Sequence, residues 1–331
     1  MAFPEAQTVT ANGLCFAAYC AGPRPDETDK PPIVFLHGWP ELAYSWRHQL
    51  AAVAAAGYPA LAFDQRGYGG SDKPEGLDHY TMAALTGDVA GVLDAFGIER
   101  AVVIGHDWGA LVTWALPFYQ PARLHALAGL CVPFRPNWPA DPIAMCRKRY
   151  GERMYIVRFQ QQGACEPVLE RDVARTFRFL MRQPRSGRAT EKPLGEADLN
   201  LVDRLDTVPE EQWPGTPFLS DADMAVFVQA FSAGGFTAPL HWYGNFTANW
   251  QDMKRYQPDG GPPPRIDLPA LMITADKDAA CPPALADGME RYIPDLTRVD
   301  LTGVGHWLQQ EQPEPVNAAI LAWLDALPAK G

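Results

Sequence analysis

Short apolar runs rich in β-branched residues alternate with helix-like stretches through the first 133 residues. The predicted strands are LCFAAY, IVFLHG, ALAFDQ, AVVIGH and ALAGLCV, and the predicted helices are SWRHQLAAVAAA, TMAALTGDVAGVLDAF and ALVTWALPFY. The alternation returns near the end with ALMITA, TRVDLTG and the amphipathic VNAAILAWLDAL. This order predicts an α/β protein with a mostly parallel sheet flanked by helices.

The segment between about 134 and 260 has a different pattern, because strand signals vanish there. The stretch EPVLERDVARTFRFLMR has apolar residues at helical spacing, and SDADMAVFVQAFSAGG begins on Ser220 and ends on two glycines, as a capped helix does. We therefore expect a helical cap domain at residues 134–260, inserted into a core domain made of residues 1–133 and 261–331.

The net charge and the composition of the chain limit the kinds of molecule that it can bind. The net charge of −11 argues against nucleic acid, which needs a basic face, so we expect a small-molecule partner. No run approaches the ~18 apolar residues that span a bilayer, so we expect no stable membrane insertion. The first twenty residues lack the pattern of a signal peptide. The six cysteines are scattered without CxxC pairs, which predicts neither a zinc site nor a disulfide framework and favours a cytoplasmic protein.

The stretch VVIGHDWGAL places Asp107 at a predicted strand-to-helix turn, with Gly105 and Gly109 two residues away on either side. Such a turn holds its central side chain out at the carboxyl edge of the sheet, and glycines allow the tight backbone. Serine or cysteine usually stands there and attacks acyl carbon. The alternative interpretation is that Asp107 is a structural N-cap of the following helix.

An aspartate at this position changes the electrophile that the site can use. A serine that attacked a saturated carbon would leave an ether, which neutral water cannot open. An aspartate leaves an ester, and water can attack the carbonyl carbon that belongs to the enzyme. Asp107 therefore predicts displacement at an sp3 carbon, as in an epoxide or an alkyl halide.

The partners of such a nucleophile follow it along the chain in the order acid, then histidine. The stretch ITADKDAACP places Asp276 and Asp278 after one predicted strand, and LTGVGHWLQ places His306 after the next. We expect His306 to deprotonate water and Asp278, the acid farther into the loop, to orient its ring, with Asp276 as the alternative. The backbone N–H groups of Trp39 and Trp108 are the expected oxyanion hole.

Five motifs, HGWPELAYSWRHQL, FDQRGYGGSDKP, IGHDWG, DKD and GHW, together resemble the soluble epoxide hydrolases of the α/β-hydrolase fold over nearly the whole chain. The resemblance implies two cap tyrosines that hydrogen-bond the epoxide oxygen, and ERMYIVRFQ and PLHWYGNF supply Tyr155 and Tyr243. The alternative for each is an aromatic side chain packed in a helical core. The resemblance also implies a supporting loop of His37, Gly38 and Pro40, with a cis peptide before the proline.

Two other functions compete with this interpretation. Haloalkane dehalogenases share the HGxP and DxWG motifs. Many of them have the first motif as HGNP, with a halide-binding asparagine where this chain has Trp39. A hydrolase-fold protein that binds without turnover is the second alternative, although no catalytic residue type is missing. Relatives often carry arginine after the second tyrosine, where this chain has Gly244, so the local anchoring of the cap stays open.

The sequence thus predicts an epoxide hydrolase that forms a vicinal diol through a covalent ester on Asp107, with no cofactor and no metal. The expected partners are a small apolar epoxide and water. A homodimer, the natural substrate and the stereochemical preference are left open.

Overall fold

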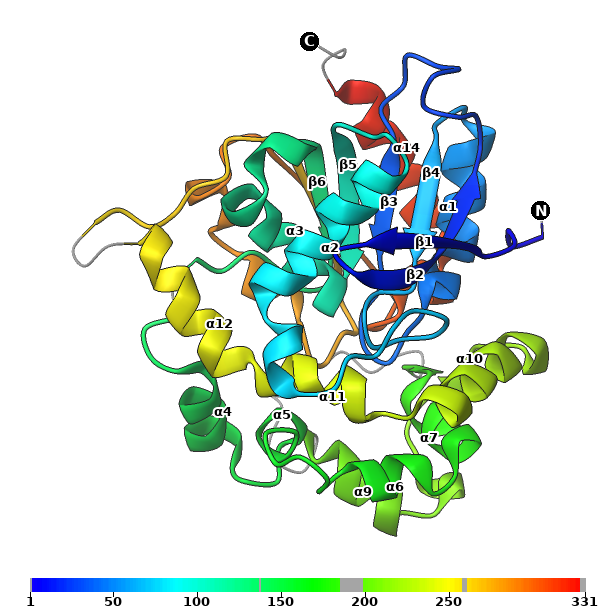
Figure 1. Ribbon diagram of the computed structural model, residues 1–331. Helices are drawn as coiled ribbons and strands as arrows, with labels where there is room; N and C mark the ends of the chain where they lie inside the picture. Colours follow the sequence, from blue (N-terminus) through cyan, green and yellow to red (C-terminus); the bar gives the residue numbers. More distant parts are fainter. Residues whose placement is uncertain (1, 137, 185–198, 258–260, 328–331) are drawn as a thin grey trace.

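The computed structural model describes residues 2–136, 138–184, 199–257 and 261–327 (Figure 1). Eight strands form one sheet in the order β1-β2-β4-β3-β5-β6-β9-β10. Their bounds are β1 Gln7–Ala11, β2 Leu14–Ala21, β3 Ile33–Leu36, β4 Ala60–Phe63, β5 Ala101–His106, β6 Leu124–Leu130, β9 Ala270–Ala275 and β10 Leu296–Leu301. Strand β2 is antiparallel to both β1 and β4, and every other pair is parallel. The predicted α/β class with a mostly parallel sheet is confirmed.

Helices cover both faces of this sheet. Helices α1 (Arg47–Ala55) and α14 (Pro313–Ala326) pack together on one face, and α2 (Met82–Ala95) and α3 (Trp108–Tyr119) pack on the other (Figure 1). Every residue of β5 is buried, and neighbouring positions alternate between two hydrophobic cores. A strand buried on both faces has a continuous apolar sequence, which is why AVVIGH was recognisable as a strand.

Strands β6 and β9 are neighbours in the sheet, but a long helical segment separates them along the chain. Its helices lie together in the lower half of Figure 1. They are α4 (Pro142–Tyr150), α5 (Tyr155–Arg158), α6 (Glu166–Glu170), α7 (Val173–Leu180), α9 (Leu201–Thr207), α10 (Asp221–Gly234), α11 (Thr237–Gly244) and α12 (Phe246–Met253). The predicted capped helix is confirmed as α10, because the Ser220 hydroxyl accepts the Asp223 N–H at 3.1 Å.

Two details of this segment differ from the expectation. The stretch from 166 to 182 forms two helices rather than one, because the Asp172 side chain accepts the Arg175 N–H at 2.9 Å and so starts α7 anew. The expectation that strands are absent was also wrong, since β7 (Arg182–Gln183) and β8 (Thr216–Pro217) form an antiparallel pair. Two-residue strands are too short to leave a periodic pattern.

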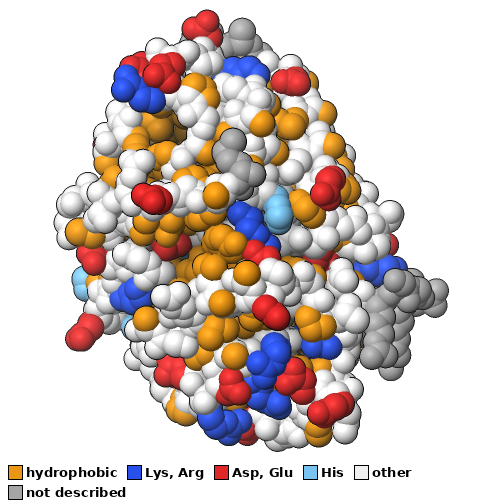
Figure 2. Space-filling model, turned by 90° about the vertical axis from the view of Figure 1, so that its right-hand side faces the viewer, with side chains coloured by type: hydrophobic (Ala, Val, Ile, Leu, Met, Phe, Trp, Pro, Cys, Tyr) orange, Lys and Arg blue, Asp and Glu red, His pale blue; other side chains and the backbone are white. Residues whose placement is uncertain are grey.

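Helix α10 is tied to the sheet-flanking part of the chain by polar contacts. The Tyr44 hydroxyl donates to Asp223 Oδ1 at 2.8 Å, and Arg47 Nε lies 3.1 Å from the same oxygen. Figure 2 views this side of the molecule and shows hydrophobic side chains gathered across its middle, with charged side chains clustered below. Among the described residues, no helix has the length and apolar character needed to cross a membrane.

Candidate active site

Asp107 lies between the end of β5 and the start of α3, with φ 51° and ψ −118°. A positive φ is costly for a residue other than glycine and persists only where the surroundings impose it. The flanking glycines are required by space: a Cβ on Gly105 would lie 2.1 Å from the Gly109 carbonyl oxygen, and one on Gly109 would lie 2.0 Å from the Leu36 oxygen. The turn therefore has the tight geometry that the small residues predicted.

The Asp107 carboxylate makes no capping hydrogen bond to α3, which contradicts the N-cap alternative. Its Oδ1 atom accepts the Trp39 backbone N–H at 2.8 Å, and its Oδ2 atom lies 3.6 Å from His306 Nε2. Gly38 allows this approach, because a Cβ there would lie 2.4 Å from the Asp107 Cβ. The Trp39–Pro40 peptide is cis, as the resemblance implied.

The acid that reaches His306 is Asp278. Its Oδ2 atom lies 2.7 Å from His306 Nδ1, and its Oδ1 atom accepts the backbone N–H groups of Ala280 and Cys281, both at 2.9 Å. Asp276 points elsewhere, because its Oδ1 accepts the Gly303 N–H at 2.7 Å. The structure therefore brings Asp107, His306 and Asp278 together and leaves Asp276 outside.

Burial and neighbouring charges have opposite effects on the pKa values of Asp278 and His306. Burial alone would raise the pKa of Asp278, but the His306 ring and the hydrogen bonds to the carboxylate lower it below its ordinary value. Burial would lower the pKa of His306, but Asp278 and Asp107 together raise it well above 6.5. The ring is therefore protonated while both carboxylates are charged.

Tyr155 begins α5 and Tyr243 lies in α11, and their ring centroids are 6.1 Å apart. The Tyr243 ring packs edge-on against Trp39 at 5.6 Å and Trp108 at 5.1 Å. Burial raises the pKa of both phenols above 10, and the Asp107 charge raises each further. Both side chains therefore stay protonated, and both face the same cavity as the nucleophile.

That cavity has a volume of about 710 Å³ and is lined by Trp39, Asp107, Tyr155, Tyr243, Asp278 and His306, among others. Farther along its wall lie polar side chains, including Gln183, Gln212 and Lys277. A second cavity of about 510 Å³ is lined by Trp108, Trp138 and Trp250, among others.

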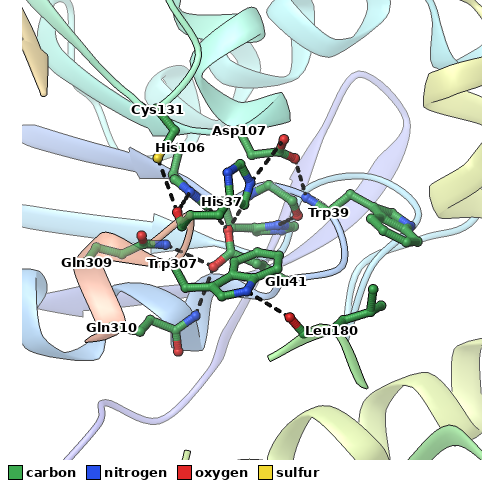
Figure 3. A network of polar contacts seen from close by, with 12 residues as sticks. His37, Trp39, Glu41, His106, Asp107, Cys131, Leu180, Trp307, Gln309 and Gln310 are labelled. Atoms are coloured by element: carbon green, nitrogen blue, oxygen red, sulfur yellow. Dashed lines mark hydrogen bonds and ion pairs between the residues drawn. The ribbon is translucent and has the colours of Figure 1, made fainter. Parts of the chain in front are cut away.

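Sequence reasoning missed a buried ion pair behind the nucleophile, formed by Glu41 and His106 (Figure 3). The His106 Nδ1 atom lies 2.7 Å from Glu41 Oε2, and both side chains are 0% exposed. Its Nε2 atom lies 2.8 Å from the His306 carbonyl oxygen. Both ring nitrogens of His106 therefore have an oxygen acceptor within hydrogen-bond distance.

The Glu41 carboxylate has four donors in all. Besides His106, it accepts the Gly38 N–H and the side-chain amides of Gln309 and Gln310, each at 2.9 Å. Burial raises the pKa of Glu41, but His106 and the Gly38 N–H lower it to about 2. The only sequence signal was position, since Glu41 follows HGWP and His106 precedes the nucleophile.

His37 follows the end of β3, and its Nε2 atom accepts the Gln65 backbone N–H at 3.0 Å. The ring therefore links two loops, as a structural residue does. Burial lowers the pKa of His37, so the ring is neutral. His106, Cys131 and His306 bring possible metal-ligand atoms within 4.8 Å of one another. Both nitrogens of His106 already have hydrogen-bond partners, however, so the donor set fits this polar network rather than a metal.

The fold and the site together define an α/β hydrolase whose nucleophile position holds a carboxylate. Residues 31–313 match the family model described as alpha/beta hydrolase fold. Epoxide hydrolase A of Mycobacterium tuberculosis is 39% identical over 333 residues, which cover 99% of each chain. Bifunctional epoxide hydrolase 2 of Sus scrofa is 34% identical over 89% of this chain and 51% of its own. The crystal structure of epoxide hydrolase A from Mycobacterium thermoresistibile matches with a TM-score of 0.85 and 35% identity, over 99% of this chain and 100% of that one. The chain belongs to the epoxide hydrolases.

Proposed function

We propose that this protein hydrolyses an epoxide to a vicinal diol in two steps, through a covalent ester on Asp107. The observation that carries the proposal is the carboxylate at the turn after β5, which faces His306 on one side and shares a cavity with two protonated tyrosines. That combination supplies a nucleophile for carbon, donors for the leaving oxygen and a base for water.

In the first step, the Oδ2 atom of Asp107 attacks a ring carbon and the carbon–oxygen bond of the epoxide breaks. Oδ1 keeps the Trp39 N–H and becomes the ester carbonyl oxygen. A phenol proton from Tyr155 or Tyr243 passes to the departing alkoxide, while the other hydroxyl donates a hydrogen bond to it. Their raised pKa values keep both phenols protonated at neutral pH.

In the second step, His306 takes a proton from water and the hydroxide attacks the Asp107 carboxyl carbon. Forming the ester has removed one of the two negative charges that raise the pKa of the ring. Before this step the ring therefore passes its resting proton through solvent to the phenolate, and it can then act as a base. Negative charge develops on Oδ1 and is stabilised by the Trp39 N–H, with the Trp108 N–H as the second expected donor. The acyl–oxygen bond then breaks and the His306 proton passes to the diol. The proton released as the Asp107 carboxylate forms again returns to the His306 ring, which restores the resting state.

We assign residues 134–260 as a cap domain and residues 1–133 with 261–331 as the core domain. In this division the core supplies Asp107, Asp278 and His306, and the cap supplies both tyrosines. The aromatic wall beside Asp107 favours a small apolar epoxide. We also propose a cytoplasmic location, because six free thiols suit a reducing compartment.

Single-turnover kinetics test the mechanism. Rapid-quench mass spectrometry with styrene oxide should show an adduct of substrate mass on the wild type and its accumulation on His306→Gln. Asp107→Asn should form none. His79→Gln, at an exposed histidine, is the matched control and should behave as the wild type. In H2(18)O, the oxygen gained in the first turnover should come from Asp107, and direct incorporation from solvent would refute the covalent route.

A further inference from the structure

The carboxylate of Glu311 binds the backbone on both sides of the catalytic histidine. Glu311 ends α13 (Leu308–Glu311), the short helix that follows His306. Its Oε2 atom accepts the Gly305 N–H at 2.8 Å, and its Oε1 atom accepts the Trp307 N–H at 3.0 Å. One side chain therefore holds the backbone N–H groups of the two residues that flank His306.

The remaining polar groups of His306 are held by other residues. Its carbonyl oxygen accepts His106 Nε2–H at 2.8 Å and Cys131 Sγ–H at 3.1 Å, and its ring is held by Asp278. None of these contacts restrains the two neighbouring amides. The position of the His306 ring is set by this backbone. The distance between His306 Nε2 and the Asp107 carboxylate therefore depends on the two hydrogen bonds that Glu311 accepts.

An ionised Glu311 is costly at this position. Burial raises the pKa of Glu311 to about 7, with the nearby Asp278 charge adding to the rise, although the two amides and His306 lower it in part. His306 and Asp278 are the charged groups that face it among the described residues. A glutamine would avoid the cost of a buried charge, but it offers only one acceptor atom for two converging N–H groups. A glutamate at position 311 therefore costs stability as a buried charge, but it can hold both N–H groups.

We propose that Glu311 is a positioning residue for the hydrolytic half of the reaction, acting through the backbone of residues 305–307 on the His306 ring. The inference rests on the proposed function, in which His306 activates the water that cleaves the Asp107 ester. A displacement of about 1 Å can slow a reaction about a hundredfold. The first half-reaction does not use His306 as a base, so it should be much less affected.

The test separates the two half-reactions in four proteins: wild type, Glu311→Gln, Glu311→Asp and Glu314→Gln. Glu314 is an exposed acid three residues away, so its variant is matched for the charge removed. With styrene oxide in single turnover, Glu311→Gln should alkylate within about twofold of the wild type but cleave the ester about ten- to a hundredfold more slowly. Glu311→Asp, which keeps two acceptor oxygens, should recover most of the rate, and Glu314→Gln should match the wild type.

Equal slowing of both steps in Glu311→Gln, or of neither, overturns the positioning role while a wild-type adduct still supports the proposed function. No wild-type adduct, with solvent oxygen entering the diol directly, overturns both. If Glu311→Gln does not fold, Glu311→Ala, which removes both acceptor oxygens, decides: a selective slowing of ester cleavage supports the role, and unchanged or equally slowed steps overturn it.

Discussion

Replacing Glu41 with glutamine would remove the carboxylate that faces His106 Nδ1 in a fully buried contact. The two side chains are fully buried 2.7 Å apart, and every donor around the carboxylate points at it. Glutamine has nearly the same size, so the change creates no cavity. Its amide nitrogen would, however, face at least one N–H donor where an acceptor stands now.

The pKa of Glu41 sets the size of the effect. The pKa falls from 4.5 to about 2 in the folded protein, which corresponds to about 3 kcal/mol of preference for the charged form. Removing one partner of a buried ion pair costs about 3–5 kcal/mol. We therefore expect Glu41→Gln to lower the free energy of unfolding by about 3 kcal/mol at pH 7, a large share of the ~5–15 kcal/mol usual for a protein.

The same shift gives a pH signature. Because the folded pKa of Glu41 lies below the unfolded one, its stabilisation is complete above about pH 4.5 and is lost as the pH falls toward 2. The difference in unfolding free energy between wild type and Glu41→Gln should therefore shrink through this window. Asp278 contributes an acid-dependent change of its own, but that change is common to both proteins and cancels in the difference.

Urea denaturation followed by tryptophan fluorescence measures these free energies, at pH 7 and at several values from pH 5 to the lowest at which the wild type stays folded. Glu99→Gln, at an exposed position, is the control for loss of one charge and should be close to the wild type. A Glu41→Gln protein within about 1 kcal/mol of the wild type at pH 7 would show that the pair is not a major source of stability. A difference that stays constant down to pH 3 would contradict its assignment to a charged Glu41.

Two further predictions concern the reaction. Tyr155→Phe and Tyr243→Phe should each slow alkylation about ten- to a hundredfold. Since burial raises the pKa of both phenols above 10, the wild-type alkylation rate should not fall between about pH 8 and 9.5, and a fall centred near pH 9 in a rapid-quench pH profile would count against these donors. Asp278→Asn should slow ester cleavage on the order of 10²- to 10⁴-fold, measured as decay of the adduct, because the His306 ring loses its carboxylate partner. The adduct on Asp276→Asn should decay near the wild-type rate. A comparable slowing of adduct decay in both variants would contradict the choice of Asp278 over Asp276.

The sequence predicted best those elements whose residues are all buried. Strands β5 and β9 were located because an entirely buried strand leaves an uninterrupted apolar run. Strand β1 was missed because it is half exposed and pairs only with β2. The division between α6 and α7 was missed because Asp172 interrupts the helix without interrupting the apolar period.

The residues of the candidate site also differ in how far the sequence could predict them. Asp107, Asp278 and His306 could be proposed because each follows a recognisable strand in a fixed order. Glu41 could not be assigned a role, since its amide donors stand on Gln309 and Gln310, more than 260 positions away. Glu311 escaped notice for another reason: its partners are backbone amides, and every residue except proline has one.

The turn after β5 couples the nucleophile to the base through two adjacent residues. Asp107 lines the cavity, while the preceding residue, His106, contacts Glu41 (Figure 3) and the His306 carbonyl oxygen. The proposed nucleophile and the residue that contacts the backbone of the proposed base are therefore joined by one peptide bond. A displacement of the turn would therefore move Asp107 and the contact with the His306 carbonyl oxygen together. The positive φ at residue 107 thus lies in a turn that also contacts the proposed base, which suits the proposed two-step reaction, since that reaction needs both side chains close together.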